Sequence, residues 1–349
     1  MSSVLDVGVL GATGMVGQQF AVQLARHPWF RLSWLAASER SEGRAYRDAA
    51  QWRLPDARPA EVADLQVDAC VPGQGPKVVF SALDAAVAGD IEQAFAAAGH
   101  IVVSNARNFR MERDVPLLIP EVNADHLALV AEQATARGWK GAIVTNPNCS
   151  TVVLAMVLAP LRQFGLRGVV VTTMQAVSGA GYPGVPSFDI LGNIVPFIGG
   201  EEEKMQSETQ KILGALAGDR VVPHPVVVSA HCNRVPVING HTITVSIGFE
   251  HKVAADEVKA AFGAFRGRPQ ELQLPSAPPR PVVYLDEPNR PQPRLDVNRD
   301  GGMTITVGRL RPDPLLDWKL VGLGHNTVRG AAGAAVLNAE LMHAQGMLS

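Results

Sequence analysis

The chain has 349 residues, with 31 Lys or Arg and 33 Asp or Glu, so its formal net charge is −2. This balance argues against a nucleic-acid partner, which needs a basic surplus or a basic stripe. Hydrophobic residues make up 47% and charged residues 18%, so the chain is able to bury a large core and is not disordered. The length suggests two domains.

The three cysteines, Cys70, Cys149 and Cys232, are too few and too scattered for a disulfide framework or a zinc site. We therefore expect free thiols and no metal. The start of the chain has no basic region of the kind a signal peptide begins with, and it runs directly into a strand-like segment, so we expect a cytoplasmic protein. The long uncharged stretch Gly141–Leu161 contains an Asn-Pro-Asn break, so we interpret it as core and expect no membrane association.

The first half of the chain predicts a parallel sheet. Short apolar runs alternate with helical stretches, among them Gln18–Arg26 and the Ala-rich Asp84–Ala98. Parallel strands are buried on both faces and form continuous apolar runs, so we predict a doubly wound, Rossmann-like α/β fold. The predicted strands are Val4–Leu10, Leu32–Ala37, Lys77–Ser81, His100–Ser104 and Ala142–Thr145.

The second half has longer, partly alternating apolar segments. Thr242–Glu250 alternates cleanly, as a half-buried strand should, so we predict an α+β region with a mixed or antiparallel sheet. The Pro-rich segment Gln273–Pro293 is expected to be an exposed excursion, and Asn326–Gln345 is expected to be helical. The other predicted strands are Val169–Val177, Val226–Ala230 and Met303–Arg309.

A glycine-rich motif, Gly-Ala-Thr-Gly-Met-Val-Gly, joins the first strand to the first helix. Glycines at such a turn let the backbone approach a pyrophosphate, and the helix N-terminus supplies N–H groups and a positive dipole end. The spacing Gly-x-x-Gly-x-x-Gly is a variant of the dinucleotide fingerprint, and its place in the chain favours dinucleotide binding over an ordinary turn. The predicted cofactor contacts are Gly11, Thr13, Gly14, Met15, Val16 and Gly17.

The end of the second predicted strand is where the adenosine ribose is recognised. Ser38, Arg40 and Ser41 favour the 2′-phosphate of NADP, whereas Glu39 would favour the 2′-hydroxyl of NAD. We expect NADP from these residues, and Glu39 leaves NAD open.

The motif Asn-Pro-Asn-Cys-Ser-Thr places Cys149 where a strand ends and an apolar helix begins. The helix dipole at that position stabilises a thiolate, so we expect a lowered thiol pKa. A thiolate is the nucleophile that acyl transfer requires. The alternative is a buried structural cysteine, which the polar neighbours of Cys149 make the weaker interpretation.

A second cluster supplies the other groups that this chemistry needs. His241 follows a glycine and enters the alternating strand, and a histidine of near-neutral pKa suits acid–base work. Arg234 is able to grip a carboxylate with two parallel hydrogen bonds. Gln175 precedes a loop containing Ser178 and Gly179, whose small residues predict a close approach to a ligand.

These motifs together resemble the aspartate-semialdehyde dehydrogenase family. The resemblance covers nearly the whole chain, and the C-terminal Gly-His-Asn-Thr-Val-Arg-Gly-Ala-Ala-Gly is similar to the archaeal and fungal branch. The resemblance implies NADP-dependent interconversion of L-aspartyl 4-phosphate and L-aspartate 4-semialdehyde, in lysine, methionine and threonine biosynthesis. It also implies a homodimer or homotetramer, with a dinucleotide-binding domain at 1–147 and 325–349 and a catalytic and dimerisation domain at 148–324.

The resemblance also implies roles for particular residues. Cys149 would be the nucleophile, His241 the acid–base group and Gln175 an orienting group. Asn148 would place the substrate, and Arg234 would bind its α-carboxylate. The remaining implied contacts are Glu201 (with Glu202 and Glu203 as alternatives) for the substrate amine or Arg234, Lys204 and Arg110 for phosphate, and Asn326 for the nicotinamide.

Three other functions remain open at this point. An acyl-CoA reductase of the malonyl-CoA reductase type would keep the thioester and hydride steps but would need no phosphate site, which makes Arg110 and Lys204 arguments against it. N-acetyl-glutamyl-phosphate reductases share the chemistry but differ at the cysteine motif. A catalytically silent nucleotide-binding paralogue would be expected to lack Cys149 or His241, and both are present.

Overall fold

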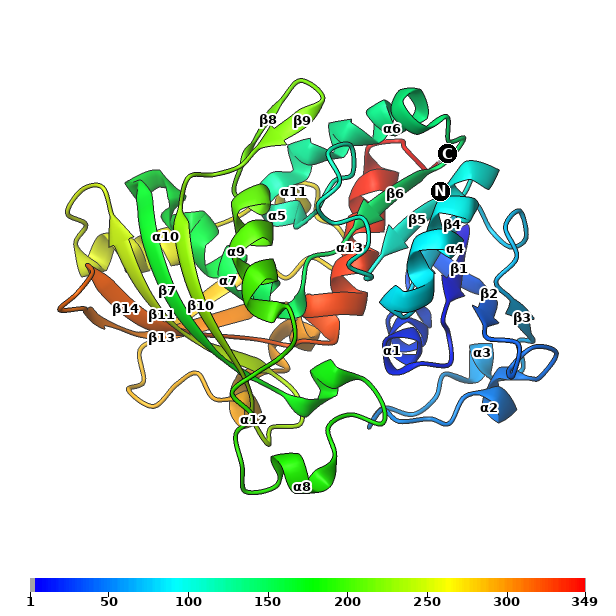
Figure 1. The fold of residues 1–349 in the computed structure, drawn as a ribbon, viewed down its shortest axis with the longest axis horizontal. Helices are drawn as coiled ribbons and strands as arrows, with labels where there is room; N and C mark the ends of the chain where they lie inside the picture. The colour runs from blue at the N-terminus through cyan, green and yellow to red at the C-terminus, as the bar shows by residue number, and fades with distance from the viewer. Residues whose placement is uncertain (1–3, 349) are drawn as a thin grey trace.

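A computed structural model describes residues 4–348, and it contains two six-stranded sheets (Figure 1). The first sheet has the order β3-β2-β1-β4-β5-β6, with every neighbouring pair parallel. This is the strand order of a Rossmann fold, so the predicted α/β fold is confirmed. Its strands are β1 (Leu5–Leu10), β2 (Phe30–Ala37), β3 (Val67–Ala69), β4 (Val78–Ser81), β5 (Ile101–Ser104) and β6 (Ala142–Thr145).

Helices cover both faces of this sheet. Alternate residues of β4 belong to different hydrophobic clusters, with Phe80 in one and Val79 in the other. Burial on both faces explains why these strands are continuously apolar in sequence. The helices are α1 (Met15–Leu24) and α13 (Gly333–Ala344) in the first cluster, and α4 (Ala85–Ala98) in the second.

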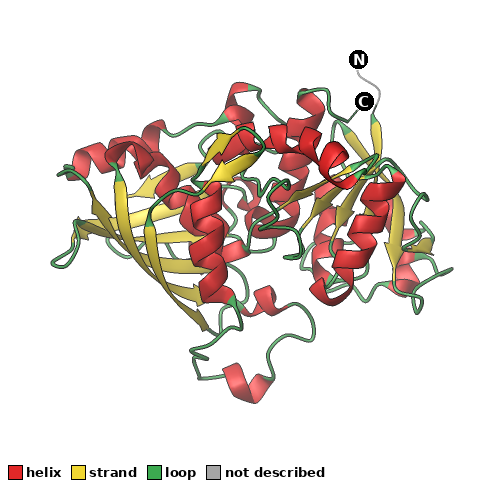
Figure 2. Cartoon of the chain, turned by 45° about the horizontal axis from the view of Figure 1, so that its top comes forward, coloured by secondary structure: helices red, strands yellow, loops and turns green. Residues whose placement is uncertain are grey.

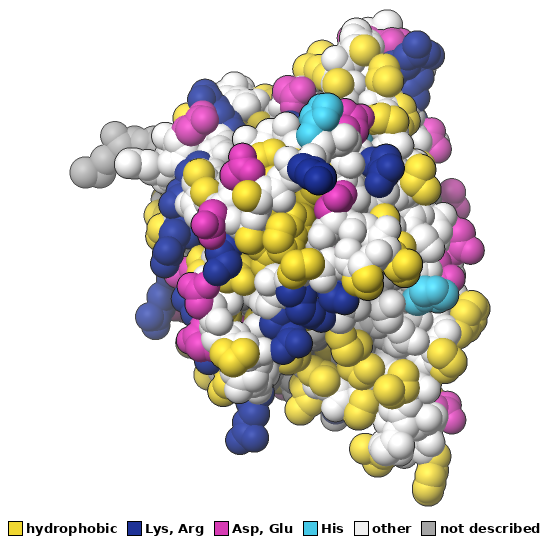
Figure 3. Space-filling model, turned by 90° about the vertical axis from the view of Figure 1, so that its left-hand side faces the viewer, with side chains coloured by type: hydrophobic (Ala, Val, Ile, Leu, Met, Phe, Trp, Pro, Cys, Tyr) yellow, Lys and Arg dark blue, Asp and Glu magenta, His cyan; other side chains and the backbone are white. Residues whose placement is uncertain are grey.

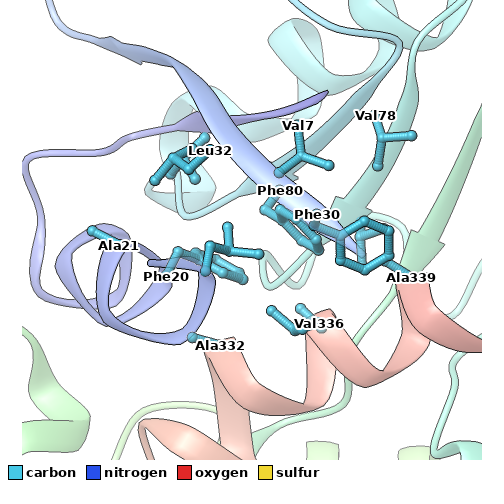
Figure 4. Packing of buried hydrophobic residues seen from close by; sticks show 14 of the residues in the cluster. Val7, Phe20, Ala21, Phe30, Leu32, Val78, Phe80, Ala332, Val336 and Ala339 are labelled. Carbon is cyan, nitrogen blue, oxygen red and sulfur yellow. The ribbon is translucent and has the colours of Figure 1, made fainter. Parts of the chain in front are cut away.

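The C-terminal helix α13 returns to the N-terminal sheet. Figure 4 shows Val336 beside Phe20 of α1 and Phe80 of β4. The two phenylalanine rings stack with their centroids 4.9 Å apart. Close packing of this kind fixes the end of the chain, and the residues just before α13, against the nucleotide-binding half.

The second sheet is mixed, as expected. Its order is β10-β7-β11-β14-β13-β12, in which β10/β7 and β12/β13 are parallel and the other pairs are antiparallel. Alternation of exposed and buried residues along β10 leaves one face open and packs the other on the core. The strands are β7 (Leu166–Gln175), β10 (Val227–Arg234), β11 (His241–Phe249), β12 (Val282–Leu285), β13 (Ile305–Pro312) and β14 (Trp318–Gly324).

The expectation of an exposed excursion over Gln273–Pro293 is wrong in part. Val282 and Val283 are buried, because β12 pairs with β13 at the edge of the second sheet. The prolines around this strand obscured a short apolar run whose partner lies later in the chain. The flanking residues of the segment form turns and loops.

One helix joins the last strand of the first sheet to the first strand of the second, and another packs against that helix. Helix α7 (Cys149–Leu158) is buried almost all round, and α9 (Glu201–Ile212) packs against it and against β10 (Figure 2). Among residues 4–348, no helix is long and apolar enough to span a membrane. The other α-helices and strands are α2 (Tyr46–Ala49), α3 (Ala60–Ala63), α5 (Pro120–Asn123), α6 (Leu129–Arg137), α8 (Ser187–Ile190), α10 (Ala255–Ala264), α11 (Arg268–Glu271), α12 (Pro293–Asp296), β8 (Ala215–Ala217) and β9 (Arg220–Val222).

Candidate active site

The glycine motif forms a tight turn between β1 and α1. Gly11 has φ +76°, and a Cβ added there would lie 2.7 Å from the carbonyl oxygen of Ala82. A Cβ at Gly17 would lie 2.4 Å from the Gly11 oxygen, so the turn admits only glycine at both positions. No side chain caps α1 at Gly14, and its first turn holds no acidic residue. The uncapped N–H groups fit an anion such as a pyrophosphate.

The motif also lies at the topological switch point of the sheet. Strands β1 and β4 are neighbours, and their crossover connections run to opposite faces, which opens a crevice at their carboxyl ends. The predicted ribose residues follow β2 at the same edge. There, the Ser41 N–H donates to the Ser38 carbonyl at 2.8 Å, and this turn leaves Glu39 and Arg40 exposed while Ser41 is buried.

Cys149 begins α7 beside the end of β6. Asn148 is the N-cap residue, and its Oδ1 accepts hydrogen bonds from the N–H groups of Ser150 at 2.9 Å and Thr151 at 3.2 Å. This cap holds the first turn rigid and so fixes the position of the thiol. The Cys149 Sγ lies 3.1 Å from Nε2 of His241.

The other ring nitrogen of His241 determines where its proton lies. The Ala176 backbone N–H donates to His241 Nδ1 at 3.1 Å. A backbone N–H is only a donor, so Nδ1 must carry a lone pair and the neutral ring carries its proton on Nε2. That Nε2–H is directed at Cys149 Sγ, and it is placed to donate to a thiolate or to a neighbouring oxyanion.

The pKa values of Cys149 and His241 both differ from those expected from the sequence. Burial, assisted by the Glu201 carboxylate, raises the pKa of Cys149 to about 12, although part of the residue reaches the surface. Burial, with the Arg234 and His325 charges, lowers the pKa of His241 to about 3. The pair is therefore an uncharged thiol and an uncharged imidazole at neutral pH, and the expected low thiol pKa and near-neutral imidazole pKa are wrong for this state.

Strand register brings three predicted residues to one edge of the second sheet. Gln175 and Arg234 are paired at the ends of the parallel strands β7 and β10. His241 starts β11, which runs antiparallel to β7, so it begins where the other two strands end. Arg234 is buried, and its Nη1 donates to the Ala176 carbonyl at 2.8 Å. Gly179 lies so close that an added Cβ would be 2.9 Å from Arg234 Nη1.

Helix α9 contributes a carboxylate that joins several of these groups. Glu201 accepts hydrogen bonds from Asn148 Nδ2 at 2.9 and 2.8 Å and from Gln175 Nε2 at 3.3 Å. Lys204 Nζ lies 2.8 Å from the same carboxylate. Of the three consecutive glutamates, Glu201 is therefore the one within the cluster. Glu202 accepts the Cys232 N–H, and Glu203 is exposed.

Arg110 reaches the same region from the loop after β5. Its Nη1 lies 3.0 Å from Oε1 of Glu208, and its Nη2 donates to the Asn105 carbonyl at 2.8 Å. Its Nε is buried and has no hydrogen-bond partner among the described residues. Glu208 and the nearby Lys211 were missed from the sequence, although both lie on the helical face of Glu201 at helical spacing.

Asn326 fixes the loop that follows β7. Its Nδ2 donates to Ser178 Oγ at 2.8 Å, and its Oδ1 accepts the Gly240 N–H at 2.9 Å. Asn326 thus ties the Ser178 loop to the residue before His241. No group of three or more His, Cys, Asp or Glu side chains in the described part of the chain is arranged to hold a metal ion.

Family models match both halves of the chain. Residues 6–130 match the NAD-binding domain of semialdehyde dehydrogenases, and residues 158–329 match their dimerisation domain. Together these matches cover most of the chain, which therefore belongs to the semialdehyde dehydrogenases.

Comparison with individual relatives shows which kind of semialdehyde dehydrogenase the chain is similar to. The chain is 51% identical to the aspartate-semialdehyde dehydrogenase of Archaeoglobus fulgidus, with 97% of each chain covered. It is 53% identical to that of Methanothermobacter thermautotrophicus, covering 97% of this chain and 99% of the relative. A crystal structure of the Candida albicans enzyme with NADP superposes with a TM-score of 0.90 at 45% identity, over 99% of this chain and 100% of that one. The chain belongs to the aspartate-semialdehyde dehydrogenase family.

Proposed function

We propose that this protein catalyses the reversible, NADP-linked and phosphate-dependent conversion of L-aspartate 4-semialdehyde to L-aspartyl 4-phosphate, a step toward lysine, methionine and threonine. The names of its relatives support this substrate, and the solved relative with NADP supports the cofactor. The observation that carries the proposal is the Cys149 Sγ to His241 Nε2 contact of 3.1 Å. A thiol held against an N–H donor suits covalent acyl chemistry.

The proposed oxidative reaction begins when the partly exposed Cys149 thiol releases its proton to solvent water and the thiolate attacks the aldehyde carbon. The carbonyl oxygen becomes an alkoxide, and the Nε2–H of His241 donates a hydrogen bond to it. Bound NADP supplies the hydride acceptor. Hydride departure from that carbon leaves a thioester on Cys149, and attack by phosphate releases the acyl phosphate and regenerates the thiolate. In this scheme His241 acts at Nε2 as a donor to negative charge on oxygen.

The surrounding residues are proposed to position the substrate. Arg234 binds its α-carboxylate, and Glu201 contacts its amine. Lys204 and Arg110 bind the phosphate, and their support is that both are cationic side chains held in place by carboxylates of α9, Glu201 and Glu208 respectively. Holding both ends of the substrate orients the reacting carbon. The proposed orienting groups near the thiol are Gln175 and Asn148, and those toward the nicotinamide are Ser178, Gly179 and Asn326.

The proposed cofactor contacts follow from the turn geometry. The loop from Gly11 to Gly17 would hold the pyrophosphate, and Ser38, Arg40 and Ser41 would surround the 2′-phosphate. We also propose a division into a dinucleotide-binding domain, 1–147 with 325–349, and a catalytic domain, 148–324. Packing of α13 against α1 supports assigning the end of the chain to the first of these.

We propose that the protein forms a homodimer or a homotetramer. The loop containing α8 exposes large apolar side chains, including Phe188, which is 99% exposed, and Phe197, which is 73% exposed. The open face of the second sheet adds Val170 and Val227. Figure 3 shows hydrophobic side chains gathered on the lower half of this end of the molecule. A second copy would cover such surfaces, and light scattering of the purified protein distinguishes dimer, tetramer and monomer.

The experiment that tests the proposed reaction is a cofactor-reduction assay. Purified protein is mixed with L-aspartate 4-semialdehyde and NADP, with and without inorganic phosphate, and NADPH absorbance is followed. We expect sustained turnover only with phosphate. NADPH oxidation with malonyl-CoA, without phosphate-dependent turnover of the semialdehyde, would instead establish the acyl-CoA reductase alternative. Replacing NADP by NAD in the same assay tests the cofactor preference that Glu39 leaves open.

A further inference from the structure

One face of helix α9 carries four charged residues that point toward the site. Glu201, Lys204, Glu208 and Lys211 are three or four residues apart, which places them on the same side of the helix. Glu208 is only 2% exposed and Lys211 only 6% exposed. Burial of charged side chains is costly, so each must have compensating partners. The proposed reaction uses Glu201 and Lys204 but assigns nothing to the other two.

Glu208 connects two parts of the site with its two oxygens. Its Oε2 accepts the backbone N–H of Asn148 at 2.6 Å, immediately before the reactive cysteine. Its Oε1 accepts a hydrogen bond from Nη1 of Arg110 at 3.0 Å. The carboxylate therefore links the start of α7 to the guanidinium that is proposed to bind phosphate.

Lys211 fixes the backbone of the loop that carries Arg110. Its Nζ donates to the carbonyl oxygens of Arg110, Glu112 and Val115 at 2.8, 2.7 and 2.8 Å. An ammonium has three N–H groups, so all of its donors are used. With its backbone held by Lys211 and its side chain held by Glu208, Arg110 is fixed at both ends relative to α9.

We propose that Glu208 is a positioning residue that holds the Arg110 guanidinium in register with the Cys149 thiol, so that bound phosphate meets the acyl carbon. This inference rests on the proposed function, because it takes Arg110 as a phosphate ligand. Glu208 neutralises one side of the guanidinium through Nη1, and the Asn105 carbonyl holds Nη2. Each of these two nitrogens carries a second N–H, which remains for an oxygen of the substrate. A fixed guanidinium loses less freedom on binding phosphate than a mobile one.

The substitution Glu208→Gln separates the two contacts of the carboxylate. The amide oxygen of glutamine still accepts the Asn148 N–H, whereas its NH₂ group faces Arg110 and offers no acceptor. We expect KM for phosphate to rise about tenfold or more, because one charge-assisted hydrogen bond is lost. KM for the semialdehyde and the rate of Cys149 alkylation should stay within about twofold of wild type. Glu203→Gln, on the exposed face of the same helix, is the matched control and should change neither constant.

A double-substitution cycle tests whether Glu208 acts through Arg110. In an Arg110→Met background, Glu208→Gln should change KM for phosphate by less than about twofold. A further tenfold rise in that background, or equal rises in both KM values for the single variant, would overturn the inference. If Glu208→Gln fails to fold, Glu208→Asp keeps the charge but shortens the reach. It should still raise KM for phosphate selectively, and the absence of a selective rise would contradict the proposal.

The wild-type assay separates failure of this inference from failure of the proposed function. A wild-type enzyme without phosphate-dependent turnover contradicts both. A wild-type enzyme that requires phosphate, with a Glu208 variant that loses both substrates equally, contradicts only the positioning role.

Discussion

Gly330 is the residue whose substitution tests the geometry around the thiol most simply. It lies in the π-helical turn Val328–Ala332, just before α13. A Cβ built on Gly330 would lie 2.7 Å from Cys149 Cβ and 3.0 Å from Cys149 Cα. Carbon atoms pack at about 3.5 Å or more, so Gly330→Ala requires a displacement of about 0.8 Å. Helix α7 is buried in the core and cannot move away without disturbing its neighbours.

The expected consequence is a misplaced nucleophile. A displacement approaching 1 Å at the reacting atom costs about 10²-fold in rate, so kcat should fall by about that factor. Crowding in the packed core should also lower the free energy of unfolding by about 1–3 kcal/mol. The measurements are kcat with saturating semialdehyde, NADP and phosphate, and urea unfolding of the same samples.

A second glycine provides the control. Gly263 lies on helix α10, and a Cβ added there would meet no atom within 4 Å. Gly263→Ala should leave kcat unchanged and should stabilise the protein by about 0.5–1 kcal/mol, since alanine is the better helix former. If Gly330→Ala retains kcat within about threefold of wild type and unfolds at the same urea concentration, the argument from close packing at the thiol is refuted.

Three further predictions concern the Cys149 thiol, the substrate contact of Arg234 and the buried ion pair of Arg329. The pKa of Cys149 is raised to about 12, and the thiolate is the form that iodoacetamide alkylates. The rate of alkylation should therefore rise about tenfold per pH unit from pH 6 to pH 9. A plateau in that rate near pH 7 would contradict the buried, neutral thiol. Arg234→Lys should raise KM for the semialdehyde about tenfold or more with less effect on KM for phosphate, since an ammonium cannot form the two parallel bonds of a guanidinium, and an unchanged KM would remove Arg234 from the substrate site. Arg329→Met leaves Glu121, its buried partner at 2.7 Å, without a counter-charge, and urea unfolding should show a loss of about 3–5 kcal/mol; a loss below about 1 kcal/mol would show that the pair is not needed.

Much of the fold was predictable because its signals are local. The apolar runs of the first half predict buried strands from their own residues, and the glycines at Gly11 predict a tight turn in the same way. The Rossmann-like sheet could be predicted from these segments. The strand at Val282–Leu285 was missed because it is short, surrounded by prolines and stabilised by pairing with β13, which lies later in the chain. Pairing between distant segments has no local signal.

The candidate site also contains residues that could be predicted from their neighbours in the sequence and residues that could not. Cys149, at the start of an apolar helix, and His241, at the start of an alternating strand, were identifiable from their neighbours. The direction of their pKa shifts was not, because the helix dipole is a local effect, whereas burial and the Glu201 charge come from segments folded over the thiol. Glu208 was missed because its partner Arg110 is 98 positions away in the sequence. Its spacing from Glu201 was visible, but a charged helical face is ordinarily solvated.

The central claim is that Cys149 carries the acyl group between hydride transfer and attack by phosphate. Its most direct test is mass spectrometry of the protein after mixing with L-aspartate 4-semialdehyde and NADP in the absence of phosphate. We expect a burst of one NADPH per active site and a mass increase of one aspartyl group, located on Cys149, that disappears when phosphate is added. Cys149→Ala should bind NADP but show neither the burst nor the adduct. An adduct on another residue, or a burst in the Cys149→Ala variant, would contradict the account.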